Sequence, residues 1–250
     1  MGSQPLISII IPVYNELGTA IELLDLVWAS PLDKEIIVIN DGSSDGTYEA
    51  MQNWVTRHDD AILLHHDENR GKGAAIISGL AAATGKLVIV QDADLEYDPR
   101  DFVRLMAPIL SGEADCVFGS RRLGESPKAA WNTWWNLRQW RNPFYHGVTF
   151  LNCLVWWWYS ARITDEATCY KLFRTDDLQR MNLACQRFEF CPEVTAKAIR
   201  MGLRIKEIPI RYTPRSVKEG KKIRLKDAWE AIRTLWKYRN WLPSQVMSRR

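Results

Sequence analysis

The chain has 250 residues, of which 46% are hydrophobic and 25% are charged, a composition that fits one large globular α/β domain and excludes collagen-like, coiled-coil and disordered chains. The net charge of +3 hides an asymmetry, because residues 1–120 hold 7 Lys and Arg against 19 Asp and Glu, whereas residues 121–250 hold 26 against 11. An acidic half suits a metal and its polar ligand, and a basic half suits phosphates on nucleic acid, an anionic membrane or a lipid.

Short β-branched runs alternate with helix-length segments along the first half of the chain. The predicted strands are Ile7–Val13, Glu35–Asn40, Ala61–His65, Leu87–Gln91 and Asp115–Gly119. The predicted helices are Glu16–Ser30, Gly46–Arg57, Gly71–Ala83 and Pro99–Leu110. This β-α-β spacing predicts right-handed crossovers and a mostly parallel central sheet flanked by helices on both faces.

The second half is rich in tryptophan. Seven of the twelve tryptophans lie between Trp131 and Trp158, and residues 142–161 contain no Asp, Glu, Lys or Arg. Polar residues dilute this uncharged run, so we expect an amphipathic interface helix over residues 131–161 that lies in the headgroup plane rather than a membrane span. A core helix with aromatic packing is the alternative.

A basic amphipathic helix is predicted over residues 225–239. Its apolar residues recur with the spacing of one helical face and are Leu225, Ala228, Trp229, Ile232, Leu235 and Trp236. This helix can dock on the domain or on a membrane. No linker or repeat divides the chain, so we expect one domain in which the second portion wraps around the first.

The cysteines and the first residues indicate the compartment. Five cysteines form no Cys-x-x-Cys pair and are odd in number, so we expect neither a disulfide framework nor a zinc cluster. A reducing cytosol fits this cysteine usage. The first residues run directly into a predicted strand without a basic and apolar leader, so a secretory signal is not expected.

Carboxylates follow the fourth predicted strand. Asp92, Asp94 and Glu96 occupy alternate positions there, so their side chains can converge. Hard carboxylate oxygens in such a cluster suit Mg²⁺ or Mn²⁺, which would neutralise a diphosphate as it leaves. A solvated acidic turn is the alternative interpretation.

Residues 40–47 form a second polar strand end. Their glycines allow close backbone approach, and Asp41 can accept hydrogen bonds from a ribose or a base. A helix N-cap turn explains the same residues. Because ligands of parallel sheets bind beyond the carboxyl ends of the strands, the two polar strand ends together indicate a nucleotide site.

Two nearby features are given structural interpretations. The adjacent His65 and His66 are expected to be polar residues at a loop edge rather than metal ligands, because neighbours on a strand point to opposite faces. The glycines around Lys72 are interpreted as a helix entry, because the pattern of a P-loop is missing.

Five ordered motifs resemble those of inverting family 2 glycosyltransferases of the GT-A fold: Pro12–Glu16, Asn40–Thr47, Asn69–Ala74, Asp92–Glu96 and Gly119–Arg121. The second half resembles the dolichyl-phosphate mannose and glucose synthase group through Thr164-Asp165, Thr168–Lys171, Phe188–Phe190, Glu193, Glu207–Ile210 and Glu219–Ile223. Together the motifs cover nearly all of residues 5–240. The resemblance implies a nucleotide-sugar lobe over residues 1–120 and an acceptor lobe over residues 121–250.

The resemblance also implies roles for individual residues. Those implied in nucleotide-sugar binding are Pro12, Tyr14 and Glu16, which line the base pocket, together with Asp41, Asp92 and Ala93. Asp94 and Glu96 occupy the metal-ligand positions, although mannose synthases commonly have Gln in place of Glu96. A carboxylate there adds negative charge.

Arg121 and Arg215 match arginines that hold the lipid phosphate in this group, and a guanidinium fork suits such a contact. Surface salt bridges are the alternative for both residues. Lys221, Lys222 and Arg224 could add to the phosphate site or form a solvated basic face. Asp94, Arg121 and Arg215 are therefore the expected catalytic residues.

The function implied by the resemblance is transfer of a hexose, from GDP-mannose or next from UDP-glucose, to a polyprenyl or dolichyl phosphate at the cytoplasmic face of a membrane. Mg²⁺ or Mn²⁺ is the expected cofactor, and a membrane partner subunit is compatible with this function. Nucleic-acid binding is not expected, because no recognised motif supports it. Two alternatives stay open: transfer to a glycan or protein hydroxyl, which needs a base, and a non-catalytic membrane or scaffold module.

Overall fold

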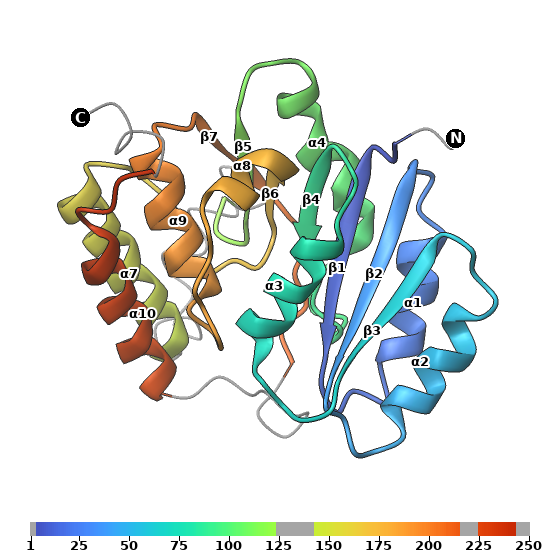
Figure 1. Ribbon diagram of the computed structural model, residues 1–250. Coiled ribbons are helices and arrows are strands. Elements are labelled where there is room, and N and C mark those ends of the chain that lie inside the picture. Colours follow the sequence, from blue (N-terminus) through green and yellow to red (C-terminus); the bar gives the residue numbers. More distant parts are fainter. Residues whose placement is uncertain (1–3, 124–142, 216–224, 244–250) are drawn as a thin grey trace.

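The computed structural model describes residues 4–123, 143–215 and 225–243. Within them one sheet has the strand order β3-β2-β1-β4-β6-β5-β7 (Figure 1). Its strands are β1 (Ile7–Val13), β2 (Lys34–Asp41), β3 (Ala61–His66), β4 (Leu87–Val90), β5 (Cys116–Ser120), β6 (Lys171–Arg174) and β7 (Ile205–Pro209). The helices are α1 (Ala20–Trp28), α2 (Thr47–Val55), α3 (Lys72–Ala82), the 3-10 turn η1 (Pro99–Asp101), α4 (Phe102–Leu110), α7 (Pro143–Tyr159), α8 (Thr175–Arg180), α9 (Phe190–Arg200) and α10 (Leu225–Tyr238).

β1 and β4 form the hydrophobic centre of the sheet. They pair in parallel and are almost completely buried, as expected for strands covered on both faces. Helix α3 lies on one side of β1, β2 and β3, and α1 and α2 lie on the other (Figure 1). Gly79 lets α3 approach closely, because a Cβ at this position would lie 2.6 Å from Cγ2 of Ile10.

The predicted parallel core is confirmed, and each predicted strand ends within one residue of its predicted bounds. One helix begins later than expected, at Ala20 instead of Glu16. The backbone N–H of Asn15 donates to Ser43 Oγ over 3.0 Å, and that of Glu16 donates to Thr47 Oγ1 over 3.1 Å. These bonds hold the segment after β1 against residues 43–47, and the non-helical φ angles of Asn15 (+50°) and Thr19 (−129°) keep the helix from starting before Ala20.

β6 and β7 were not predicted. β6 lies antiparallel between β4 and β5, and β7 runs parallel to β5. β6 has only four residues and begins with the buried Lys171, whose ammonium donates to the backbone carbonyls of Glu166 and Thr168. A strand this short with a lysine at its start carries no usable periodicity.

Helices α7 and α10 lie side by side at the end of the molecule opposite α1 and α2 (Figure 1). α7 contains the described part of the predicted tryptophan-rich helix, and residues 131–142 lie outside the described residues. α10 confirms the predicted C-terminal helix. Among the described helices, none has the length and hydropathy needed to cross a bilayer.

The predicted apolar face of α10 is only partly buried against the domain. The buried side chains of this helix are Asp227, Ala231, Thr234, Leu235 and Tyr238. Trp229 and Trp236, which the helical spacing placed on the apolar face, are 69% and 49% exposed. Tyr159 of α7 donates its hydroxyl to the carbonyl of Leu235, and the Trp158 ring of α7 lies edge-on to the Trp236 ring at 5.3 Å, so α10 is held on the domain through α7.

Candidate active site

The polar strand ends meet at one edge of the sheet. β1, β2 and β4 are parallel neighbours, and β5 runs in the same direction because β6 is antiparallel to both β4 and β5. The segments that follow these strands therefore leave the sheet at the same edge, where parallel sheets bind ligands. Among the residues implied in base binding, Tyr14 is exposed, while Pro12 and Glu16 are half-buried.

Asp41 is bound within the protein. Its buried carboxylate accepts hydrogen bonds from Asn69 Nδ2 at 3.0 Å, from the backbone N–H groups of Arg70 and Gly71 at 3.0 and 2.8 Å, and contacts the His66 ring at 2.8 Å. Gly42 has φ +72°, and a Cβ there would lie 2.5 Å from the Asn69 nitrogen. Asp41 thus holds the loop that leads into α3, and its role toward a nucleoside stays a prediction.

Both adjacent histidines belong to β3, whose predicted end is His65, and His66 is buried, so the loop-edge interpretation is wrong for His66. His65 and His66 both pair with β2. His66 is buried between Asp41 and Ser78, whereas the His65 ring contacts Asn40 Nδ2 at 2.8 Å. Their different partners agree with side chains on opposite faces of a strand.

Lys72, in the first turn of α3, contacts the first acidic residue after β4. Its Nζ lies 2.5 Å from Asp92 Oδ1, and Cys169 Sγ lies 3.3 Å from the same oxygen. Burial alone would lower the pKa of Lys72, but the charge of Asp92, with contributions from Cys169 and Cys191, raises it well above its usual value. The helix entry at Lys72 is confirmed, but no sequence motif indicates this ion pair.

The next two carboxylates form an acidic cluster with Glu16. Asp94 and Glu96 flank Leu95, whose φ of +60° bends the chain sharply between them. Burial, followed by the negative charges of Asp92 and Glu96, raises the pKa of Asp94 to about 7. Burial and two neighbouring carboxylates thus both disfavour the charged form of Asp94.

Arg215 lies on this acidic cluster. Its Nη1 is 3.1 Å from Glu16 Oε2, its Nη2 is 3.3 Å from Asp94 Oδ2, and its backbone N–H donates to Glu96 Oε1 over 2.8 Å. The residue implied in acceptor binding thus contacts the residues implied in metal and base binding. Lys221, Lys222 and Arg224 lie outside the described residues.

The carboxylate oxygens of the acidic cluster are suitable ligands for a hard divalent cation, but they do not complete its coordination shell by themselves. Asp94 and Glu96 offer carboxylate oxygens, and the raised pKa of Asp94 marks a position that favours added positive charge. In the part of the chain that the structure describes, no three His, Cys, Asp or Glu side chains are grouped closely enough to hold a metal ion. A cation here would take its remaining ligands from a bound diphosphate or from water.

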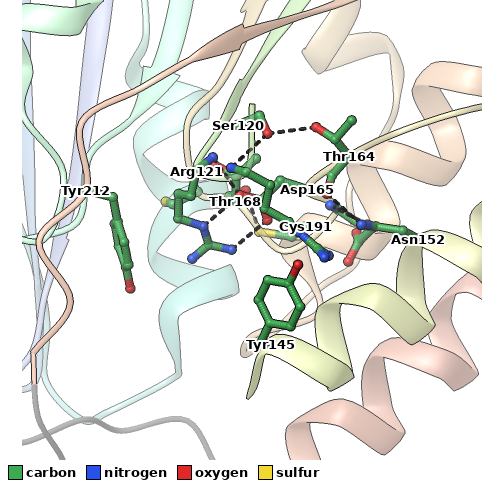
Figure 2. A network of polar contacts seen from close by, with 12 residues as sticks. Ser120, Arg121, Tyr145, Asn152, Thr164, Asp165, Thr168, Cys191 and Tyr212 are labelled. Atoms are coloured by element: carbon green, nitrogen blue, oxygen red, sulfur yellow. Dashed lines mark hydrogen bonds and ion pairs between the residues drawn. The ribbon is translucent and has the colours of Figure 1, made fainter. Parts of the chain in front are cut away.

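Arg121, at the end of β5, is held by Asp165. Its Nε and Nη2 each lie 2.7 Å from a different oxygen of this fully buried carboxylate, and its backbone N–H donates to Asp165 Oδ2 over 2.9 Å. Figure 2 shows the Arg121 side chain between Tyr212 and the segment that contains Thr164 and Asp165. The bidentate pair leaves Arg121 in one orientation.

Tyr212 joins the two halves of the site and was missed by the sequence analysis. Arg121 lies over its ring, 5.0 Å from the centroid, and its hydroxyl donates to Glu96 Oε2 over 2.6 Å. Tyr212 also forms an isolated antiparallel bridge with Tyr97. An isolated tyrosine between two charged residues has no motif of its own, so only the fold reveals this position.

Comparisons with known proteins agree with this fold. A family model described as Glycosyl transferase family 2 matches residues 8–177. The undecaprenyl-phosphate mannosyltransferase of Micrococcus luteus is 27% identical over 218 residues, which cover 85% of this chain and 85% of that protein. The dolichyl-phosphate beta-glucosyltransferase ALG5A of Trichomonas vaginalis is 31% identical over 221 residues, and the match covers 82% of this chain and 65% of that protein.

Among solved structures, the chain is similar in fold to glucosyl-3-phosphoglycerate synthase from Mycobacterium tuberculosis in complex with Mn²⁺, uridine diphosphate and phosphoglyceric acid. The TM-score is 0.68 at 19% sequence identity, and the match covers 96% of this chain and 80% of that one. At this identity the likeness establishes the GT-A fold, and the fold predicted from the ordered motifs is confirmed.

Proposed function

The chain belongs to glycosyl transferase family 2, and on that premise we propose that it transfers a hexose from a nucleotide sugar to a polyprenyl phosphate, with inversion at the anomeric carbon. The observation that carries the proposal is the link that Tyr212 makes between the acidic cluster and Arg121. The cluster suits a diphosphate with its cation, and arginine suits an anionic acceptor. Tyr212 therefore lies between the proposed donor site and the proposed acceptor site and contacts both.

The chemistry is a single displacement. An oxygen of the lipid phosphate attacks the anomeric carbon, the bond from that carbon to the diphosphate breaks, and its electron pair leaves with the nucleoside diphosphate. The acceptor is already ionised near neutral pH, so no general base has to remove a proton. Arg121, fixed by Asp165, positions the acceptor, and Arg215 adds a second positive charge.

Mg²⁺ or Mn²⁺ is the proposed cofactor, and Asp94 and Glu96 would hold it. When bound, the ion supplies positive charge that stabilises the leaving diphosphate. Asp92 is paired with Lys72, so we assign it with Ala93 to contacts with the nucleotide or sugar rather than to the ion. Pro12, Tyr14, Glu16 and Asp41 remain the proposed base and nucleoside residues.

The donor proposed first is GDP-mannose, and UDP-glucose is the next. Both choices come from the resemblance to the mannose and glucose synthase group. The Micrococcus luteus relative is a mannosyltransferase and the Trichomonas vaginalis relative a glucosyltransferase by name, so the relatives support either hexose.

We further propose that the α7 and α10 face meets a membrane surface peripherally. Trp157 of α7 is 76% exposed and Trp229 of α10 is 69% exposed. Exposed large side chains on the same two helices include Phe150, Trp156 and Trp236. Aromatic rings of this kind favour the headgroup region, and the exposed Arg233 and Lys237 of α10 suit anionic lipid.

A second candidate function is favoured by one observation. A carboxylate whose pKa is raised to about 7, as that of Asp94 is, has the value expected of a general base at neutral pH. Transfer to a glycan or protein hydroxyl would need such a base. In that case Asp94 would remove the hydroxyl proton instead of holding the cation.

The test is a sugar-transfer assay with the whole purified protein, Mn²⁺ or Mg²⁺, a short-chain polyprenyl phosphate and a panel of radiolabelled GDP- and UDP-sugars. Label in the organic phase supports the proposal and identifies the donor. An Asp94→Asn variant is the matched control, because it keeps the size of the side chain and removes its charge. If no label enters the organic phase although calorimetry shows that the nucleotides still bind, the lipid-phosphate acceptor is wrong, and a hydroxyl acceptor becomes the better proposal.

A further inference from the structure

Arg215 contacts carboxylates that come from two different strand ends. Glu16 follows β1, and Asp94 and Glu96 follow β4, yet all three accept hydrogen bonds or ion pairs from this one residue in the segment after β7. The guanidinium lies between Glu16 at 3.1 Å and Asp94 at 3.3 Å. A single positive group thus bridges the base-pocket loop and the acidic segment.

The hydrogen-bonding capacity of the Arg215 guanidinium is not fully used by the described residues. Nε of Arg215 is shielded from solvent and finds no hydrogen-bond partner among the residues that the structure describes. Its ion pair with Asp94 is longer than the 2.7 Å bonds of the Arg121–Asp165 pair. Both terminal nitrogens of Arg215 also contact Glu16, at 3.1 and 3.3 Å, so the guanidinium can leave Asp94 and remain paired.

We propose that Arg215 takes the position of a divalent cation in the ligand-free protein, and that the guanidinium and the cation exclude each other at Asp94. The inference rests on the proposed function, which assigns Asp94 and Glu96 to the cation. Two positive groups against one carboxylate repel each other strongly where water is largely excluded. Cation binding therefore displaces the Arg215 side chain from Asp94, and the displaced guanidinium becomes available to an anionic acceptor.

The two arginines of the site then differ in how firmly their side chains are held. Arg121 is fixed, because fully buried Asp165 holds it through two nitrogens. Arg215 is exchangeable at Asp94, because the cation needs that carboxylate, whereas Glu16 accepts from both terminal nitrogens of Arg215 and can keep them. The acceptor site is complete only after the donor and its cation have bound, so the exchange orders the two substrates.

Thermodynamic linkage makes the exchange measurable without turnover. If Arg215 and the cation compete for Asp94, removing the guanidinium must raise the affinity for the cation. The probe is Mn²⁺ alone, titrated into the whole protein without nucleotide and followed by the electron paramagnetic resonance signal of free Mn²⁺. Arg215→Ala is expected to bind Mn²⁺ about tenfold more tightly than the wild type, within the usual range of such couplings.

Arg211→Ala is the matched control, because Arg211 is an exposed arginine four residues away that pairs with Asp98 and Asp101 instead. It removes the same charge and should leave the Mn²⁺ affinity unchanged within about twofold, because exposed charges are screened. Arg215→Lys, which keeps the charge, should stay close to the wild type and guards against misfolding of the alanine variant. An equal gain in the Arg211 variant would indicate a general charge effect and overturn the proposal.

Asp94→Asn separates failure of this inference from failure of the metal site. If Asp94→Asn weakens Mn²⁺ binding but Arg215→Ala does not strengthen it, the cation site stands and the exchange is wrong. If Asp94→Asn changes nothing, or if no variant binds Mn²⁺, the proposed cation site is wrong and the exchange fails with it. The double variant should bind no more tightly than Asp94→Asn alone.

Discussion

The guanidinium of Arg121 lies over the ring of Tyr212, 5.0 Å from its centroid. The same tyrosine donates its hydroxyl to Glu96, so the fixed arginine and the acidic cluster share one neighbour. A change at Tyr212 should therefore reach both halves of the site, whereas a change at either charged residue should act first on its own half.

Tyr212→Phe should lower sugar transfer about tenfold while costing about 1 kcal/mol of stability, the usual net value of one hydrogen bond. The ring that supports Arg121 is retained, but Glu96 loses the hydroxyl donor at 2.6 Å. Initial rates and urea unfolding measure the two effects. Tyr159→Phe, which removes a buried tyrosine hydroxyl remote from the site, is the control and should lose stability without a comparable loss of rate.

Arg121→Ala should cost about 3–5 kcal/mol of unfolding free energy, because it leaves the carboxylate of Asp165 buried and unpaired. Arg204→Ala breaks a bidentate pair of the same type with Asp115, but Arg204 is 60% exposed, so we expect less than about 1 kcal/mol. Urea unfolding of the two variants measures this difference. Equal losses would contradict the view that Asp165 fixes Arg121 by burial.

The raised pKa of Asp94 predicts that stability depends on pH. Burial and the neighbouring carboxylates raise the pKa in the folded protein to about 7, above the ordinary value of 3.8, so the folded state binds the proton more tightly. This group therefore costs no stability below about pH 4, and its cost grows as the pH rises and is complete above about 7. The metal-free Asp94→Asn variant should gain stability over the wild type at pH 8, by at most about 4 kcal/mol, and little at pH 4.

Unfolding free energies of both proteins at several pH values, measured with a chelator present, check this prediction. A difference between the two proteins that is constant from pH 4 to 8 would show that Asp94 titrates normally.

The proposed membrane contact of α7 and α10 is tested by a double variant, Trp157→Ser with Trp229→Ser. Both side chains are largely exposed, so their loss should leave unfolding unchanged and lower the association with anionic liposomes about tenfold. Trp28→Ser is the matched control, because Trp28 is 49% exposed on α1, at the other end of the molecule (Figure 1). Sedimentation with vesicles measures the bound fraction, and equal binding by all three proteins would reject this surface.

Patterns that act within a short stretch of chain were predicted well. The apolar runs of β1 and β4 are continuous because both faces of these strands are buried, and the helices between strands are long enough to be recognised by length. The C-terminal helix was also recognised, but the sequence did not decide which of its apolar residues pack on the domain. Trp229 and Trp236 satisfy helical periodicity equally well whether they face a core or the solvent.

Pairings between distant residues could not be predicted in the same way. β6 has four residues, and its place between β4 and β5 depends on partners far away in sequence. The ion pair between Lys72 and Asp92 and that between Arg121 and Asp165 join segments that the sequence analysis had noted separately. In both ion pairs, the motif that contains one residue does not contain the residue that binds it.

The sequence by itself determined the alternation of strands and helices, the polar residues at the strand ends and the family motifs that imply their roles. These depend on local periodicity and on residue type. Only the tertiary structure decided that Asp41 holds the loop before α3, that Tyr212 joins two charged groups and that Arg215 rests on Asp94. A carboxylate can pair with any cation that the fold brings within reach, so its partner is set by the packing of the whole chain.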